Sequence, residues 1–249
     1  MKTTRIFGVE IELGVNLQQT KRVVHRDIGL GRIQREEWKR TGVHPYGSFE
    51  ILPGWKYVYD GSCGAEIVSP PLNDAWSIIE MCNRIQESKI DYHLNKCGLH
   101  VHVQAIDYTP EDVLSLSRFC RHFNRTIYSF MAKSRFKDQY CRPNFTNDAA
   151  LKATADGMGW AETDNARYRG LNIRAMGAHG TIEFRYSEGT DKHERICALV
   201  DLYTSMMDWC KDNHDKVKSP KGVAAKRKYL LDLIGVSSRN QAQLLSTEF

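Results

Sequence analysis

Three short segments of the chain place charged or imidazole side chains at alternate positions between apolar residues. The pairs are Glu10 with Glu12, His100 with His102, and Glu183 with Arg185. Because side chains alternate across a β-strand, both members of a pair share one face if the segment is a strand. A sheet with one core face and one solvent face would give the same alternation. Solvent faces are usually filled with Lys, Thr, Ser and Gln, however, so these pairs favour a functional face.

The pair of Glu10 and Glu12 predicts a metal site. Two carboxylates on one strand face lie roughly 6.5–7 Å apart, and they repel each other unless a cation lies between them. Asp60 and Glu66 flank a turn and a short strand and add further acidic oxygens. Carboxylate oxygens with an imidazole suit Mg²⁺ or Mn²⁺ better than a structural zinc site. We therefore expect a concave sheet lined with metal ligands.

Arginines in and before the third segment extend this chemistry to phosphate. Arg185 lies on the expected strand, and Arg167, Arg169 and Arg174 precede it. Divalent ions and nearby arginines together hold phosphates during phosphoryl transfer. The chain has no G-x-x-x-x-G-K-[ST] motif, so the sheet itself would have to hold a nucleotide. A solvated basic loop is the alternative for the three preceding arginines.

These segments occur in an order that resembles the amidoligase family of carboxylate–amine ligases. That family is related to glutamine synthetase and glutamate–cysteine ligase. The resemblance covers roughly residues 5–190. The segments that carry it are Gly8–Glu12, Asp60–Ser62, Glu66–Pro70, Gly98–Val103, Arg135–Pro143, Arg167–Asn172 and Thr181–Arg185.

The resemblance implies an α+β fold of the glutamine synthetase type. In that fold a curved antiparallel sheet carries the active site on its concave face, and helices pack on its convex face. The resemblance also implies an ATP- and Mg²⁺-dependent enzyme that joins a carboxylate to an amine through an acyl phosphate. Its products would be an amide or isopeptide bond, ADP and phosphate. The substrates would be small-molecule or peptide carboxylates and amines.

By position, the resemblance also implies roles for single residues. Glu10 would be the metal ligand on the ATP side, and Glu12 the ligand on the substrate side. His102 would face the nucleotide or the substrate. The further metal ligands would be Glu66, His100 and Glu183, and Asp60 would be another acidic group of the catalytic centre. The phosphate would be bound by Arg185, and the transferred phosphoryl group steadied by Arg167 and Arg174.

The elements that must position these residues follow from the apolar pattern. We expect strands over residues 5–15, 55–60, 66–69, 98–106 and 181–187, and helices over 74–88, 109–133, 192–212, 223–234 and 238–246. The helix over 74–88 should turn Trp76, Ile79, Cys82 and Ile85 inward. Thr109 and Pro110 are typical of a helix start. Strands mixed with long helices, without regular β-α-β alternation, predict an α+β fold with an antiparallel sheet.

Two parts of the chain lie outside this pattern. Residues 16–54 are rich in glycine, and we expect a loop there with a short helix near 33–40. Residues 213–249 begin with a polar, basic hinge and continue as two helices. We therefore predict a catalytic domain over residues 1–212 and a basic helical extension over 213–249.

Composition sets broader limits on function and location. The chain has 249 residues, of which 41% are apolar and 26% charged, as in ordinary globular proteins. Its 35 basic and 30 acidic residues leave a net charge of +5, which would suit an anionic ligand. Seven cysteines without C-x-x-C spacing, and the lack of a signal peptide or a long apolar run, predict a cytoplasmic protein that does not enter a membrane. The cysteines at 82, 120, 197 and 210 fall in helical apolar patterns and should be core residues.

Two other functions are compatible with the sequence. His-x-His on a strand also occurs in metal-dependent hydrolases, which usually need further histidines and an aspartate. The basic run from Lys211 to Lys228 could bind nucleic acid, although a solvated surface is the simpler interpretation. A ligase could also act on a group carried by nucleic acid. A non-catalytic ligase fold is disfavoured by the full set of acidic and imidazole residues.

Overall fold

The computed structural model describes residues 5–15, 49–60, 63–87, 92–144, 166–213 and 221–246. Its centre is an open antiparallel sheet in the order β2-β3-β4-β1-β6-β8-β7, with β5 paired to β1. The strands are β1 (Phe7–Val15), β2 (Phe49–Leu52), β3 (Trp55–Asp60), β4 (Gly64–Val68), β5 (Tyr92–His93), β6 (Gly98–Gln104), β7 (Leu171–Asn172) and β8 (Thr181–Glu188). The fold is therefore of the α+β class, as predicted.

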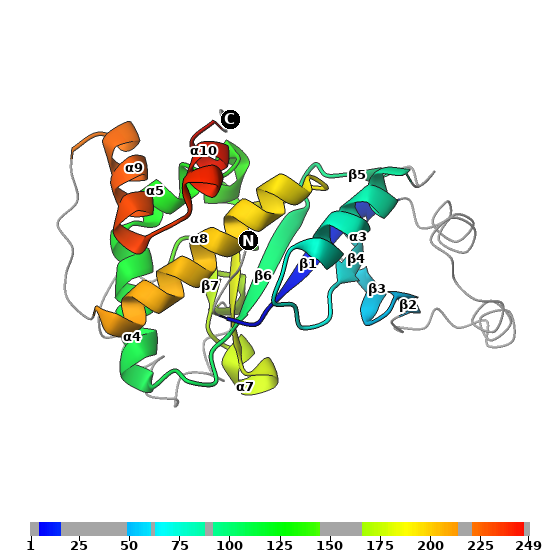
Figure 1. Ribbon diagram of the computed structural model, residues 1–249, viewed down its shortest axis with the longest axis horizontal. Helices are drawn as coiled ribbons and strands as arrows, with labels where there is room; N and C mark the ends of the chain where they lie inside the picture. The colour runs from blue at the N-terminus through cyan, green and yellow to red at the C-terminus, as the bar shows by residue number, and fades with distance from the viewer. Residues whose placement is uncertain are drawn as a thin grey trace, which may run out of the picture.

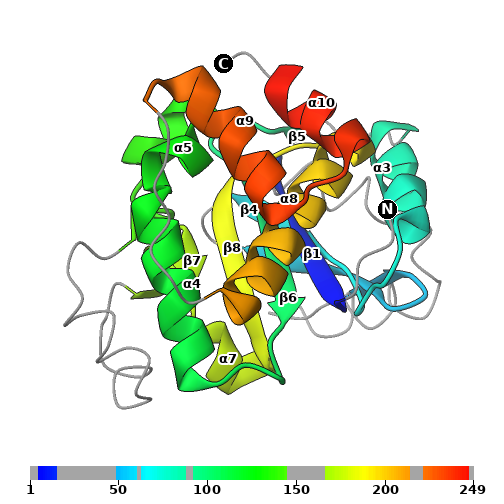
Figure 2. The ribbon, with the colours of Figure 1, turned by 60° about the vertical axis from the view of Figure 1, so that its left-hand side comes forward.

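The described helices are α3 (Trp76–Glu87), α4 (Pro110–His122), α5 (Asn124–Tyr128), α7 (Ala175–His179), α8 (His193–Asp212), α9 (Val223–Ile234) and α10 (Ser238–Ser246), with short 3-10 helices η1 (Lys133–Lys137) and η2 (Ala166–Tyr168). The longest of them, α8, lies over one face of the sheet, whereas the ring of His179 in the short α7 lies 6.0 Å from that of His102, on the other face. Figure 1 shows α8 crossing the strands, with α3 beside it over β1 and β4. Figure 2 shows α9 and α10 outside α8, which both of them contact.

The core lies between the sheet and α8. Alternate residues of β1, from Phe7 to Leu13, are at most 1% exposed and point toward the helices. One face of α8 is fully buried against the sheet: Ile196, Leu199, Tyr203, Met206 and Cys210. The other residues of β1, β6 and β8 face away from the helices, because side chains alternate across a strand. One face of the sheet therefore packs against α8 in the core, and the polar pairs lie on the opposite face.

The helix over 109–133 is predicted as one element, but it is divided. Thr109 accepts a hydrogen bond from the backbone N–H of Asp112, and the Asp112 carboxylate accepts one from the backbone N–H of Thr109. This reciprocal capping box starts α4. α4 ends at His122, and α5 begins after Phe123.

Trp76 and Ile79 correct the predicted inward face of α3. Trp76 is 72% exposed and Ile79 is only partly buried, whereas the buried residues of the helix are Ile78, Met81, Cys82 and Ile85. Their spacing of three and four residues gives one continuous apolar stripe, and position 76 lies outside it. β2 is a second correction, because it occupies residues that were expected to form a loop. The expected helix near 33–40 lies outside the described residues.

The C-terminal helices α9 and α10 pack into the same hydrophobic core as the rest of the described chain. Leu230, Leu231 and Leu244 are fully buried and belong to the same apolar cluster as β1 and α8. Most of the expected hinge, residues 214–220, lies outside the described part. The cysteines at 82, 120, 197 and 210 are buried free thiols, as predicted. Among the described helices, none is long and apolar enough to cross a membrane.

Candidate active site

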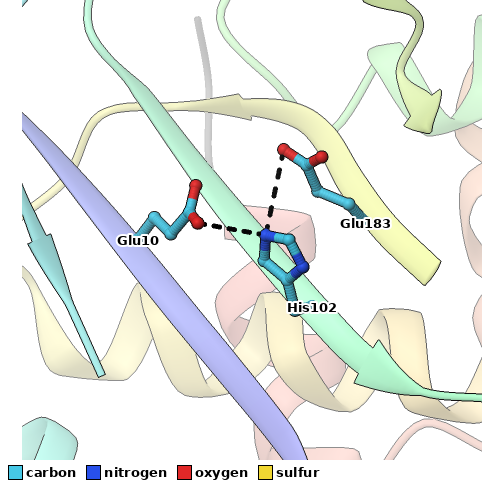
Figure 3. Close-up of side chains that lie close together, drawn as sticks. All are labelled: Glu10, His102 and Glu183. Atoms are coloured by element: carbon cyan, nitrogen blue, oxygen red, sulfur yellow. Dashed lines mark ion pairs between the residues drawn. The ribbon is translucent and has the colours of Figure 1, made fainter. Parts of the chain in front are cut away.

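Strand register brings the polar pairs together on the face opposite the helices. β1 lies between β4 and β6, and β6 lies between β1 and β8. Glu12 pairs with Glu66 across β1 and β4. Glu10 pairs with His100 across β1 and β6, and His102 pairs with Glu183 across β6 and β8. Four neighbouring strands therefore contribute to one cluster of carboxylates and imidazoles, and Figure 3 shows three of its members side by side.

Glu10 lies between the two imidazoles of β6. Its Oε2 is 3.0 Å from Nδ1 of His100, and its Oε1 is 3.2 Å from Nε2 of His102. Burial alone would raise the pKa of Glu10, but the two imidazoles lower it well below its ordinary value. The same carboxylate raises the pKa of His102 against the lowering effect of burial. Glu10 is therefore an ionised carboxylate at neutral pH.

Glu12 is held at the other side of His100. Its side chain is buried, with Oε1 3.2 Å from Nε2 of His100, and its Oε2 accepts a hydrogen bond from the backbone N–H of Gly98. A Cβ atom at Gly98 would come within 3.2 Å of Glu12 Oε2 and 3.1 Å of His100 Nε2. Glycine at position 98 therefore leaves room for Glu12 and His100 beside the backbone, and a larger residue would require these side chains to shift by a few tenths of an ångström.

Glu183 completes the cluster from β8. It is 4% exposed, and its Oε1 is 3.5 Å from Nδ1 of His100. Its Oε2 accepts a hydrogen bond of 2.5 Å from the side-chain amide of Asn172, and its Oε1 accepts one of 2.5 Å from Arg185. Burial would raise the pKa of Glu183, but His100 and then Arg185 lower it.

Two overlapping groups in this cluster have the geometry to hold a cation. Glu10, His102 and Glu183 form one group, and Glu10, Glu66 and His100 form the other; within each group the ligand atoms lie within 4.8 Å of one another. Nε2 of His102 is buried and makes no hydrogen bond of good geometry to any described residue. Figure 3 shows this nitrogen directed between Glu10 and Glu183. The sequence assigns His102 to the nucleotide or substrate, whereas the structure also places it among the candidate metal ligands.

Arg185 is the predicted arginine that reaches the cluster. Burial alone would lower its pKa, but the adjacent carboxylate of Glu183 raises it, so the guanidinium stays charged. Arg167 is exposed and lies over the ring of Tyr168, with Cζ 4.9 Å from the ring centroid. In the described part of the chain, neither Arg167 nor Arg174 contacts the cluster. Asp60 ends β3 opposite Gly64, and its side chain lies outside the described part.

A pocket of about 520 Å³ opens at the Gly8 end of the cluster. Glu10, His102 and Thr181 contribute polar groups to its wall, and His102 Nδ1 lies 3.0 Å from Thr181 Oγ1. The other lining residues include Val68, Pro70, Pro71 and Ile106. A largely apolar cavity with a few convergent polar groups is typical of a small-molecule site.

Some residues of the site were given no role by the sequence. Asn172 binds Glu183, and Arg135 donates hydrogen bonds to β8 carbonyls. Both lie in segments that carry the family resemblance, but a single asparagine or arginine shows no pattern from which its partner could be predicted. The role of Gly98 could not be predicted from the sequence either, because it depends on the close approach of side chains from two strands.

A comparison with protein families identifies a similar family. The model of a family described as "Putative amidoligase enzyme" matches residues 3–207, which include every segment of the cluster. No curated protein matches the chain.

Proposed function

The chain belongs to the amidoligase family, and we propose that it is an ATP- and Mg²⁺-dependent carboxylate–amine ligase with a glutamine synthetase-like fold. One observation carries the proposal: carboxylates and imidazoles from four strands converge on one sheet face beside the charged Arg185. An oxygen-rich ligand set of this kind suits Mg²⁺ or Mn²⁺. The acids and amines that it would join are small molecules or peptides.

The candidate ligands fit divalent ions. Glu10 would be shared between two ions, because it belongs to both groups of converging ligand atoms. His102 and Glu183 would complete one site, and Glu66 and His100 the other, with Glu12 beside His100. The position of His102 Nε2 supports this assignment, because it lies 3.2 Å from Glu10 Oε1 and 4.0 Å from Glu183 Oε1, between two carboxylates. Bound there, Mg²⁺ would neutralise phosphate charge and orient the γ-phosphate.

The pocket at Gly8 is the proposed site of the nucleotide base. Its apolar walls suit a planar, uncharged ring, and Glu10 and His102 line its inner end. A base in this pocket would place the phosphates over the Glu10, His102 and Glu183 group. Arg185 lies farther along the same face, where it can donate to the transferred phosphoryl group.

The reaction needs an activated acid. A carboxylate does not acylate an amine at neutral pH, because oxide would have to leave. Attack of a carboxylate oxygen on the γ-phosphorus breaks the bond to the β–γ bridging oxygen and releases ADP. The amine then attacks the acyl carbon and loses a proton, and phosphate leaves. The guanidinium of Arg185 supplies planar paired donors for the charged oxygens in these steps.

The test is ADP release by purified protein with Mg²⁺-ATP, screened over pairs of acids and amines, with mass spectrometry of each product. A ligase gives ADP and a product whose mass is the sum of the two substrates less water. A metal-dependent hydrolase gives a cleaved product without ATP. The ligand set favours the ligase, because carboxylates outnumber imidazoles in the cluster.

The basic C-terminal run gives little support to nucleic-acid binding. Lys211 forms an ion pair with Asp107, and Lys228 forms one with Asp232 at 2.9 Å. Both lysines therefore already neutralise carboxylates of this chain. Residues 214–220 of the run lie outside the described part.

A further inference from the structure

Arg185 lies in a β-bulge of β8. Leu99 of β6 pairs with Ser187, and Val101 pairs with Phe184, so one residue of β6 faces two residues of β8. Those two residues are Arg185 and Tyr186. A bulge disturbs the hydrogen-bond ladder and redirects side chains, and bulges are common beside active sites. Here the Arg185 guanidinium lies 2.5 Å from Glu183 Oε1 and 3.4 Å from His100 Nδ1.

Arg135 of η1 binds both carbonyls of the bulge. Its Nη2 donates a hydrogen bond of 3.0 Å to the carbonyl oxygen of Arg185, and its Nε donates one of 3.4 Å to that of Tyr186. The side chain is 4% exposed. A planar guanidinium can hold two such acceptors at once, which an ammonium group on a flexible stem cannot match.

Asp138 connects Arg135 to the far side of Arg185. Its Oδ2 accepts a hydrogen bond of 2.9 Å from Nη1 of Arg135, and its Oδ1 accepts one of 2.8 Å from the backbone N–H of Tyr140. The carbonyl oxygen of Tyr140 in turn accepts a hydrogen bond of 3.2 Å from Nε of Arg185. Arg135, Asp138 and Tyr140 thus close a ring of hydrogen bonds around Arg185. We name these three residues the Arg185 clamp.

We propose that the Arg185 clamp fixes the direction of the Arg185 guanidinium, with Arg135 as a positioning residue that acts through Arg185. Arg135 is buried and its nitrogens are engaged, so it does not itself contact substrate. The clamp holds Arg185 at two points, the backbone carbonyl and the side-chain Nε, and both points are needed to orient a long side chain. The catalytic consequence of the clamp rests on the proposed function, whereas the structural statement does not.

The direct test uses the Nε–H resonance of Arg185 in ¹H–¹⁵N NMR spectra. The resonance is assigned as the signal that is missing in Arg185→Lys. We expect its hydrogen exchange to become at least about tenfold faster in Arg135→Lys and in Asp138→Ala, because loss of one hydrogen bond permits local opening. Asp138→Ala leaves the Arg135 guanidinium in place and serves if Arg135→Lys does not fold.

Arg195→Lys is the matched control. Arg195 is also a buried arginine, and it binds Glu188 farther along β8 at 2.9 Å. Glu188 also accepts a hydrogen bond from the backbone N–H of Ala132, just before η1. The substitution therefore controls for a general disturbance of β8 and of the start of η1 while every hydrogen bond of the clamp keeps its partners. The Arg185 signal should exchange at the wild-type rate in this variant. Wild-type exchange in a folded clamp variant, or equally fast exchange in Arg195→Lys, would overturn the proposal.

A kinetic cycle tests the functional part. If the wild-type protein releases ADP, Arg135→Lys should lower kcat by about tenfold to a hundredfold, as is found for residues that orient a metal ligand. The double variant Arg135→Lys/Arg185→Lys should be no slower than Arg185→Lys alone, because a residue that acts through Arg185 has no effect without it. If the kcat loss of the double variant equals the product of the two single losses, Arg135 does not act through Arg185. Absence of wild-type turnover would contradict the proposed function. The NMR exchange rates would then be the test of whether the clamp orients Arg185.

Discussion

Glu10 occupies a central place because two imidazoles approach it from the same neighbouring strand. His100 lies directly opposite on β6, and His102 lies one strand repeat farther along. Both imidazoles lower the pKa of Glu10 although burial would raise it. An ionised carboxylate that belongs to both groups of converging ligand atoms should affect both when it is changed. Glu66 belongs to one group, so the two glutamates can be told apart by experiment.

Glu10→Gln and Glu66→Gln should differ in how much Mn²⁺ the protein binds. We expect Glu10→Gln to weaken all tight Mn²⁺ binding by at least about a hundredfold, because even residues that merely orient a ligand are worth 10–100-fold. Glu66→Gln should weaken one class of site and leave the other. Electron paramagnetic resonance of free Mn²⁺ measures both stoichiometry and affinity. Glu80→Gln, on the exposed side of α3, is the control, and equal effects of the two site variants would count against a shared ligand.

Gly8→Val should separate nucleotide binding from metal binding. A Cβ atom at position 8 would meet Ser69 Oγ at 3.5 Å and His102 Cβ at 3.9 Å, which are ordinary contacts, so β1 should persist. The valine methyl groups would occupy the pocket proposed for the base. We expect KM for ATP to rise by at least about tenfold, the effect of losing 1.4 kcal/mol of binding. Mn²⁺ affinity should stay within about twofold, and an unchanged KM would place the nucleotide elsewhere.

At the scale of elements, the register of the antiparallel strands determines which side chains meet in the site. Glu10 and Glu12 lie on the same face of β1. Their pairing partners on the neighbouring strands are His100 of β6 and Glu66 of β4. The bulge in β8 then shifts the register so that His102 faces Glu183 and Arg185 turns toward the same cluster. On the opposite face α8 contacts β6, and α4 packs against α8. The helix starts that hold this layer should therefore affect stability more than activity.

Thr109→Ala should destabilise the protein without changing the site. The substitution removes the Thr109 side-chain acceptor for the N–H of Asp112 and ends the reciprocal capping box of α4. Loss of such a cap costs about 1 kcal/mol of unfolding free energy, within a range of about 0.5–2. Urea denaturation measures the change, and Thr109→Ser should restore most of the stability because its hydroxyl makes the same bond. An undiminished midpoint in Thr109→Ala would mean that the cap contributes nothing.

At the scale of the whole molecule, the alternating pairs allowed much of the sheet and cluster to be predicted. The period of two is a local property, so Glu10, Glu12, His100 and Glu183 could be placed on strand faces before any contact was known. The β8 bulge, the two-residue strand β7 and the Arg185 clamp depend on contacts between distant segments, and no local pattern reports them. Trp76 shows the same limit, because the position of an apolar residue on a helix depends on which face the core covers.

The last prediction concerns the order of bond formation in the complete reaction. The proposed mechanism transfers the γ-phosphoryl group to an oxygen of the substrate carboxylate, and that oxygen leaves with phosphate when the amine attacks. An acid labelled with ¹⁸O in its carboxylate should therefore deliver one labelled oxygen to the released phosphate, as read by mass spectrometry. An adenylating ligase would instead place the label in AMP, and a simple ATPase would place it in neither product. The acidic cluster beside Arg185 favours attack at the γ-phosphate. Label in AMP would exclude the acyl phosphate while keeping the ligase, and ATP consumption without transfer of label would exclude ligation of the acid tested.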